Sequence, residues 1–106
     1  MKIVGITACP AGIAHTYMAQ ENLERVCKKR GFDVKIETQG SLGIENELEE
    51  DEIEAADLVI LGISIAIEGE ERFDGKIVYQ TTADPCVTHP ESVIDAALDY
   101  YAAHQA

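Results

Sequence analysis

The sequence predicts an α/β fold, a three-layer α/β/α sandwich around a four-stranded parallel sheet of strand order 2-1-3-4. Segments typical of strands and of helices alternate along the chain, which favours a parallel sheet covered by helices on both faces. Two of the strand-like segments are rich in β-branched and apolar residues, as in strands buried on both faces. The length of 106 residues suits one core, so we expect a single domain over residues 1–106.

The first half of the chain supplies two strands and a long helix. Residues 2–8 (KIVGITA) are rich in β-branched and apolar types and predict the first strand. Apolar residues at helical spacing predict a helix over 15–30, which Gly31 ends. Residues 33–38 (DVKIET) alternate between apolar and polar types, which favours a strand nearer an edge of the sheet.

The second half continues the alternation. We expect a loop at QGSLG, a short acidic helix within 45–57, a buried third strand at 58–63 (LVILGI) and a short helix or turn at 68–75. Residues 76–80 (KIVYQ) predict the fourth strand. An amphipathic helix begins at Pro90, a residue type that suits the first turn of a helix.

Composition and charge exclude several classes of function. The net charge of −12 argues against binding to nucleic acid, whose phosphates attract basic surfaces. No apolar run approaches the roughly 20 residues of a membrane span, so we expect no direct membrane insertion. The three cysteines have no metal-ligand spacing, and their odd number suits a reducing compartment. We therefore expect a cytoplasmic protein without a metal ion.

The segment CPAGIAHT, which follows the first strand, is the candidate site. In a parallel sheet, ligands bind beyond the carboxyl ends of the strands. Gly12 permits a tight loop, and the N–H groups that open the next helix can bind a phosphate-like anion. The same positive helix end favours the thiolate form of a cysteine. Cys9 is thus the candidate nucleophile, and the candidate phosphate-binding residues are Pro10, Ala11, Gly12, Ile13, Ala14, His15 and Thr16.

The same residues also have purely structural interpretations. A thiol at the end of a strand can simply pack in the core, because cysteine is among the most buried residue types. Cys27 lies on the apolar stripe of its helix and is expected in the core, whereas Cys86 could approach the same edge of the sheet as Cys9. For His15, exposure to solvent and a role in stabilising the loop or handling protons are both open.

Three classes of function could use this loop. Low-molecular-weight tyrosine phosphatases have the motif C-x5-R-[ST] after the first strand of a similar sheet, and this chain has C-x5-H-T, with Asp84 as a candidate general acid. Histidine cannot replace the planar fork with which arginine binds two phosphoryl oxygens. A phosphoryl carrier needs a weaker seat, which backbone amides, one hydroxyl and one imidazole can supply. A binding or regulatory module that only reuses the fold is the third class.

The run TACPAGIAHTYMAQENLE resembles the active-site segment of the fructose-type enzyme IIB domains of the bacterial sugar phosphotransferase system, which have the motif C-P-x-G-I-A-H-T. The resemblance continues in KIETQGSLGIENEL, in EAADLVIL and in GEERFDGK, and it covers roughly residues 2–80. Position 11, commonly threonine or serine in that family, is alanine here, which removes one side-chain donor from the loop.

The resemblance implies a four-stranded parallel sheet and a phosphotransferase role without a cofactor. Cys9 would accept a phosphoryl group from a phosphohistidine of a IIA protein. It would then pass the group to a sugar, fructose or fructose-like, that a membrane-embedded IIC partner holds. The cysteine-phosphatase activity is the alternative. Residues near the strand ends would form the partner surface: Gln39, Gly40, Leu42 and Ile65.

Overall fold

A computed structural model describes residues 1–10 and 13–105 of the chain, with Ile13 described by its backbone alone. The strands are β1 (Lys2–Ala8), β2 (Asp33–Gly40), β3 (Gly43–Glu45), β4 (Leu58–Ile63) and β5 (Val78–Thr81). The helices are α1 (Ile13–Lys29), α2 (Glu50–Ala55), the 3₁₀ helix η1 (Glu70–Phe73), α3 (Ala83–Thr88) and α4 (Pro90–Ala103). Within the described residues, no helix has the length and apolar character needed to cross a membrane.

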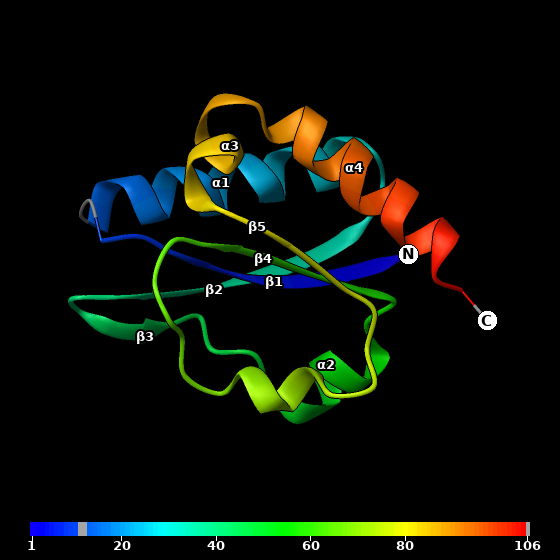
Figure 1. Cartoon of the computed structure of the whole chain (residues 1–106), viewed down its shortest axis with the longest axis horizontal. Coiled ribbons are helices and arrows are strands. Elements are labelled where there is room, and N and C mark those ends of the chain that lie inside the picture. Colours follow the sequence, from blue (N-terminus) through cyan, green and yellow to red (C-terminus); the bar gives the residue numbers. More distant parts are fainter. Residues whose placement is uncertain (11–12, 106) are drawn as a thin grey trace.

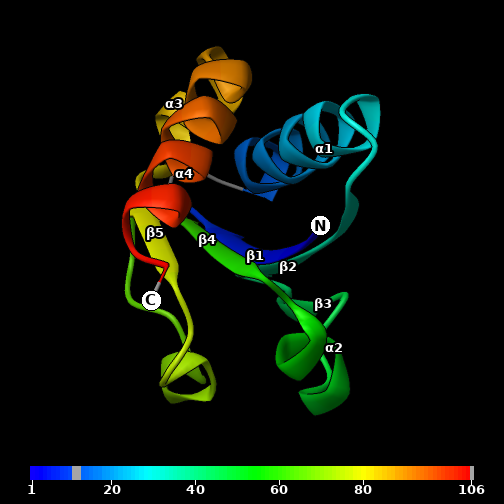
Figure 2. The same ribbon diagram turned by 90° about the vertical axis from the view of Figure 1, so that its right-hand side faces the viewer.

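The strands form one mixed sheet in the order β3-β2-β1-β4-β5. Figure 1 shows α1, α3 and α4 above this sheet and α2 below it, so the molecule has three layers. In Figure 2, turned by 90°, α4 again lies beside α1 on the same side of the sheet. The strand β1 is central, because it pairs in parallel with β2 on one side and with β4 on the other.

Alternate residues of β1 face two separate apolar cores. Ile3 packs with α1 and α4 in the upper core, whereas Val4 and Ile6 join the core beneath the sheet. Gly5 is required at a close approach of two strands, since a Cβ atom there would lie 2.3 Å from the carbonyl oxygen of Ile60. Burial on both faces explains why β1 and β4 are rich in apolar residues. Their predicted bounds, 2–8 and 58–63, are confirmed.

The prediction of a four-stranded, wholly parallel sheet of order 2-1-3-4 is wrong, because the sheet has five strands and is mixed. The added strand, β3, returns antiparallel to β2 through the turn that joins Gly40 to Gly43. Gly43 has a φ of 91°, which favours glycine, and so the predicted loop at QGSLG is a hairpin. All three residues of β3 are exposed, and for that reason no buried alternation in the sequence signals this strand.

Two helices differ from the prediction. Helix α1 begins at Ile13, two residues earlier than expected, which brings its first turn closer to Cys9. The short acidic helix expected within 45–57 is confirmed and occupies Glu50–Ala55. The helix α3 was not predicted, because Pro85 suggests a turn. Pro85 lies in the first turn of α3, where its missing N–H would have no intrahelical acceptor.

Candidate active site

Cys9 lies at the carboxyl end of the central strand. β1 ends at Ala8 and α1 begins at Ile13, so the thiol lies between the strand and the first turn of the helix. Cys9 is largely buried, with 9% of its surface exposed. The first N–H groups of an α-helix have no intrahelical acceptor and carry the positive end of the helix dipole. The start of α1 therefore offers a favourable position for a bound anion.

His15 contacts the sulfur of Cys9 directly. Its Nδ1 atom lies 3.1 Å from the Cys9 Sγ atom, and its Nε2 atom lies 3.3 Å from Oδ1 of Asp84. The His15 side chain is 26% exposed and that of Asp84 is 81% exposed. Of the two interpretations of His15 that the sequence left open, the geometry favours a contact with the site over simple exposure to solvent.

Thr16 contributes a buried hydroxyl group beside Cys9. The residue is only 1% exposed, and its Oγ1 atom has no hydrogen-bond partner among the described residues. The backbone at this point is fixed, because the Thr7 hydroxyl of β1 donates a hydrogen bond of 3.1 Å to the carbonyl oxygen of Thr16. A buried hydroxyl without a partner costs free energy unless a ligand or a water completes its hydrogen bonding. Thr16 is therefore a candidate donor to a bound anion.

A pocket of about 350 Å³ opens beside the thiol. Cys9, Pro10 and Thr16 form one side of it, and Gln39 and Gly40 from the end of β2 form another. Ile44 of β3 and Ile65 of the loop after β4 complete the apolar part of the lining. The pocket thus gathers residues of α1, β2 and β3 and of the loops after β1 and β4 around Cys9.

Most of the predicted site residues meet in this region. Cys9, Pro10, Thr16, Gln39, Gly40 and Ile65 line the pocket, and His15 contacts Cys9. Ala14 is exposed in the first turn of α1, and Leu42, 71% exposed, lies in the turn between β2 and β3 rather than in the pocket lining. Ala11, Gly12 and the side chain of Ile13 lie outside the described residues.

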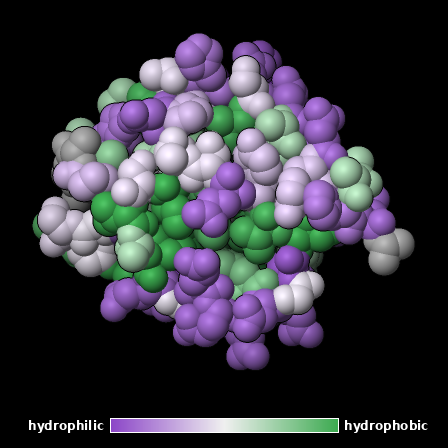
Figure 3. Space-filling model, in the orientation of Figure 1, coloured by the Kyte–Doolittle hydropathy of each residue, from purple (hydrophilic) through white to green (hydrophobic). Residues whose placement is uncertain are grey.

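Large apolar side chains of the pocket lining are exposed. Ile44 and Ile65 are each 37% exposed, and Leu42, in the turn between β2 and β3, is 71% exposed. Figure 3 shows apolar side chains in a band across the middle of the visible face, on the left beside the loop that follows β4 and again to the right of centre, whereas hydrophilic side chains cover the layer of α2 and η1. Exposed apolar residues that adjoin a reactive group are typical of a surface for a protein partner.

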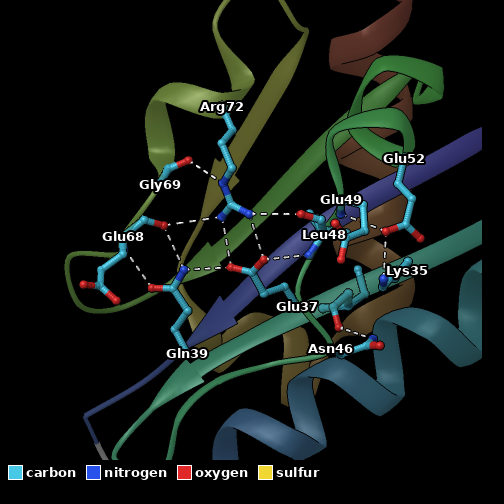
Figure 4. Close-up of polar contacts among 11 residues, drawn as sticks. Lys35, Glu37, Gln39, Asn46, Leu48, Glu49, Glu52, Glu68, Gly69 and Arg72 are labelled. Carbon is cyan, nitrogen blue, oxygen red and sulfur yellow. Dashed lines mark hydrogen bonds and ion pairs between the residues drawn. The ribbon is translucent and has the colours of Figure 1, made fainter.

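A buried ion pair supports the far wall of the pocket (Figure 4). Arg72 of η1 donates two hydrogen bonds of 3.0 Å to the two carboxylate oxygens of Glu37, which is fully buried on β2. The amide nitrogen of Gln39 donates to Glu37 at 2.8 Å and to the carbonyl oxygen of Glu68 at 2.9 Å. The Gln39 amide oxygen accepts the N–H of Glu68. The loop after β4 is thereby fixed against the end of β2.

The ion pair sets the protonation state of Glu37. Burial alone raises the pKa of this carboxyl group, but the hydrogen bonds from Arg72, Gln39 and the N–H of Leu48 outweigh burial, so the pKa lies below its usual value. Glu37 is therefore a charged, fully hydrogen-bonded structural group. No local pattern in the sequence signals this contact, because Glu37 and Arg72 are 35 residues apart.

The other two cysteines have a different environment from Cys9. Cys27 and Cys86 are both fully buried in the upper core, which confirms the prediction for Cys27. Burial raises the pKa of Cys27 to about 11 and that of Cys86 to about 12, so both stay neutral thiols. Across residues 1–10 and 13–105 there is no cluster of three His, Cys, Asp or Glu residues arranged to hold a metal ion.

The comparisons with known proteins agree with this site. The family model described as "PTS system, Lactose/Cellobiose specific IIB subunit" matches residues 4–96. The chain is 47% identical to the "PTS system fructose-like EIIB component 2" of Escherichia coli K12, over 88% of each chain. It is 52% identical to the "Fructose-like PTS system EIIBC component" of the same organism, over 76% of this chain and 17% of that protein.

A solved structure shows the same fold. The "Predicted Fructose Specific IIB from Escherichia Coli" is 39% identical and has a TM-score of 0.91, over 98% of this chain and 92% of that one. The chain therefore belongs to the IIB family of the sugar phosphotransferase system and is a phosphotransferase component of the fructose type.

Proposed function

We propose that this chain carries a phosphoryl group on Cys9, between a phosphohistidine of a IIA protein and a sugar bound by a membrane IIC partner. One observation carries the proposal: the Cys9 sulfur lies at the first turn of α1, 3.1 Å from an imidazole nitrogen of His15. That position combines a nucleophile with donors for the oxygens of a phosphoryl group.

The two transfers are in-line displacements at phosphorus. In the first, the Cys9 thiolate attacks the phosphohistidine, the S–P bond forms, the N–P bond breaks, and the imidazole of the donor retains the electron pair. In the second, a sugar hydroxyl attacks phosphorus and gives its proton to solvent or to a base of the IIC partner, the S–P bond breaks, and Cys9 leaves as a thiolate. Both steps need positioning and charge stabilisation of the phosphoryl oxygens rather than a covalent contribution from other residues.

The groups around Cys9 would bind the phosphoryl oxygens with moderate strength. The N–H groups at the start of α1, the Thr16 hydroxyl and the His15 ring supply donors, and the candidate loop has no arginine. A carrier must release its group, so a weaker seat than the bidentate arginine of a phosphatase suits transfer. The family and the histidine at the sixth position after Cys9 both disfavour the phosphatase alternative.

The surface around the pocket is the proposed docking surface for the partners. Leu42, Ile44 and Ile65 are exposed next to the residues that line the pocket, and Gln39 and Gly40 form its floor at the end of β2. The name of the relative "EIIBC component" joins a B and a C component, which supports a IIC partner for this chain. Transfer between those partners would take place in the cytoplasm.

The test is transfer to sugar in a reconstituted system. Purified chain is combined with a phosphorylated IIA protein and with membrane vesicles that contain the IIC partner, and labelled sugar phosphate is measured. We expect Cys9→Ser to abolish product formation and Cys86→Ala, which also removes one thiol, to retain it. Sugar phosphate formation at the wild-type rate in the Cys9→Ser variant would exclude the proposed route.

A further inference from the structure

Two side chains contact the His15 ring among the contacts of the described residues. Cys9 lies on one side of the ring, and the carboxylate of Asp84 lies on the other. The ring is therefore held from both sides, with Cys9 Sγ 3.1 Å from Nδ1 and Asp84 Oδ1 3.3 Å from Nε2. These three residues come from the end of β1, from α1 and from α3, and no short motif in the sequence joins them.

We propose that Asp84 is a positioning residue that holds the His15 imidazole against the sulfur of Cys9. A carboxylate accepts a hydrogen bond, so Asp84 keeps the proton of His15 on Nε2 and fixes the orientation of the ring. In that tautomer Nδ1 faces the sulfur and can accept the thiol proton as the thiolate forms. The inference rests on the proposed function, because it gives Asp84 a part in the chemistry of Cys9.

Helix α3, which carries Asp84, is held in place by buried side chains and by hydrogen bonds to its neighbours. Ala83 and Cys86 are fully buried, and the N–H of Ala83 donates to the Ser64 hydroxyl at 3.1 Å. On α1, the Asn22 side chain donates to the carbonyl oxygen of Val87 at 2.9 Å. Asp84 therefore projects from a short helix that is fixed to the same α1 that carries His15.

The direct field of Asp84 has the opposite sign from its effect through His15. A carboxylate near a thiolate repels it, so removal of that charge alone would increase the thiolate fraction and the reactivity of Cys9. If Asp84 instead acts by holding His15, its removal lowers the reactivity. The direction of the change thus separates a positioning role from a simple surface charge.

The test measures the rate at which iodoacetamide alkylates Cys9, located by mass spectrometry, at neutral pH and low salt. Because Asp84 is largely exposed, we expect Asp84→Asn to slow alkylation only about two- to fivefold. In a His15→Ala background the same substitution has no slowing effect, since the two residues act as a unit. Asp95→Asn is the matched control, because Asp95 pairs with Arg30 beyond the other end of α1.

Two further measurements complete the test. Nitrogen-15 NMR of the His15 ring is expected to show a proton on Nε2 in the wild type and a loss of that preference in Asp84→Asn. Asn22→Ala, which frees α3 from α1, is expected to slow alkylation in the same direction by a smaller factor. Faster or unchanged alkylation in Asp84→Asn, or equal slowing with and without His15, would overturn the proposal.

These measurements use neither a IIA nor a IIC protein. Slower alkylation of Asp84→Asn together with an absence of phosphoryl transfer in the wild type would refute the proposed function and leave the role of Asp84 intact. The reverse result, transfer without coupling between Asp84 and His15, would refute only the role of Asp84.

Discussion

Two polar clusters lie at the carboxyl end of the sheet, and they differ in how completely their hydrogen bonds are satisfied. In the first, the buried carboxylate of Glu37 accepts hydrogen bonds from Arg72, Gln39 and the N–H of Leu48. In the second, around Cys9, the buried hydroxyl of Thr16 has no partner among the described residues, and a pocket opens beside the sulfur.

The difference separates structure from function. A buried charge is tolerated only when its hydrogen bonds are complete. The folded chain itself completes the hydrogen bonds of the Glu37 cluster, so this cluster needs no ligand. The Cys9 cluster keeps a donor and a space available, and a site of that kind is completed by a ligand. We therefore expect substitutions in the first cluster to act on stability and substitutions in the second to act on transfer.

The largest effect on stability is expected for Arg72→Met. The variant leaves the buried carboxylate of Glu37 without its charged partner, and loss of one partner of a buried pair costs about 3–5 kcal/mol. Urea denaturation followed by circular dichroism measures the free energy of unfolding. Arg25→Met, at an exposed arginine of α1, is the control and should change it little. Equal stability of the two variants would contradict the structural role of the pair.

The second effect is a loss of stability in acid that depends on Glu37. Its pKa is lower in the folded chain than in the unfolded chain, so its contribution is fully present above the unfolded value of about 4.3. The contribution is lost as the pH falls through the lowered folded pKa. Denaturation curves between neutral pH and pH ~3 should therefore show a smaller loss of stability in Glu37→Gln than in the wild type. Parallel pH profiles of the two proteins would contradict this assignment.

A smaller effect, on both stability and transfer, is expected for Gln39→Leu. Gln39 joins the two clusters, because it binds Glu37 and the backbone of Glu68 and also lines the pocket. The loss of these hydrogen bonds should cost about 1–3 kcal/mol and loosen the wall beside Cys9. The free energy of unfolding, measured by denaturation, and the initial rate of phosphoryl transfer from IIA should both decrease. If Gln39→Leu changes neither the stability nor the transfer rate, Gln39 does not link the ion pair to the pocket.

The smallest effect on stability is expected for Thr16→Val. The two side chains have nearly the same shape, and the lost hydroxyl makes no hydrogen bond within the described residues, so the free energy of unfolding should change by less than about 1 kcal/mol. The rate of transfer to Cys9 should nevertheless fall, because a donor to the phosphoryl oxygens is removed. Thr7→Val, which loses a hydrogen bond to the Thr16 backbone, is the companion variant. An unchanged rate in Thr16→Val would show that the hydroxyl has no part in transfer.

The sequence predicts what is local and misses what is distant. Cys9, His15 and Thr16 lie within eight consecutive residues between a strand and a helix, so a single motif identifies them. Asp84 contacts His15 from α3, a helix that the sequence does not predict because Pro85 suggests a turn. No sequence motif links Asp84 to His15. The alternation of polar and apolar residues in β2 predicts a strand near the edge of the sheet. Glu37 on the polar face is nevertheless buried, because η1 places Arg72 over it. The exposed strand β3 leaves no apolar pattern at all.

The most direct test of the central claim is to locate the phosphoryl group itself. The purified chain is incubated with a phosphorylated IIA protein, digested at a pH at which thiophosphates survive, and mapped by mass spectrometry. We predict the added mass of one phosphoryl group on the peptide with Cys9, and none on that peptide from the Cys9→Ser variant. A phosphoryl group on His15 or on another residue, with Cys9 unmodified, would contradict the account.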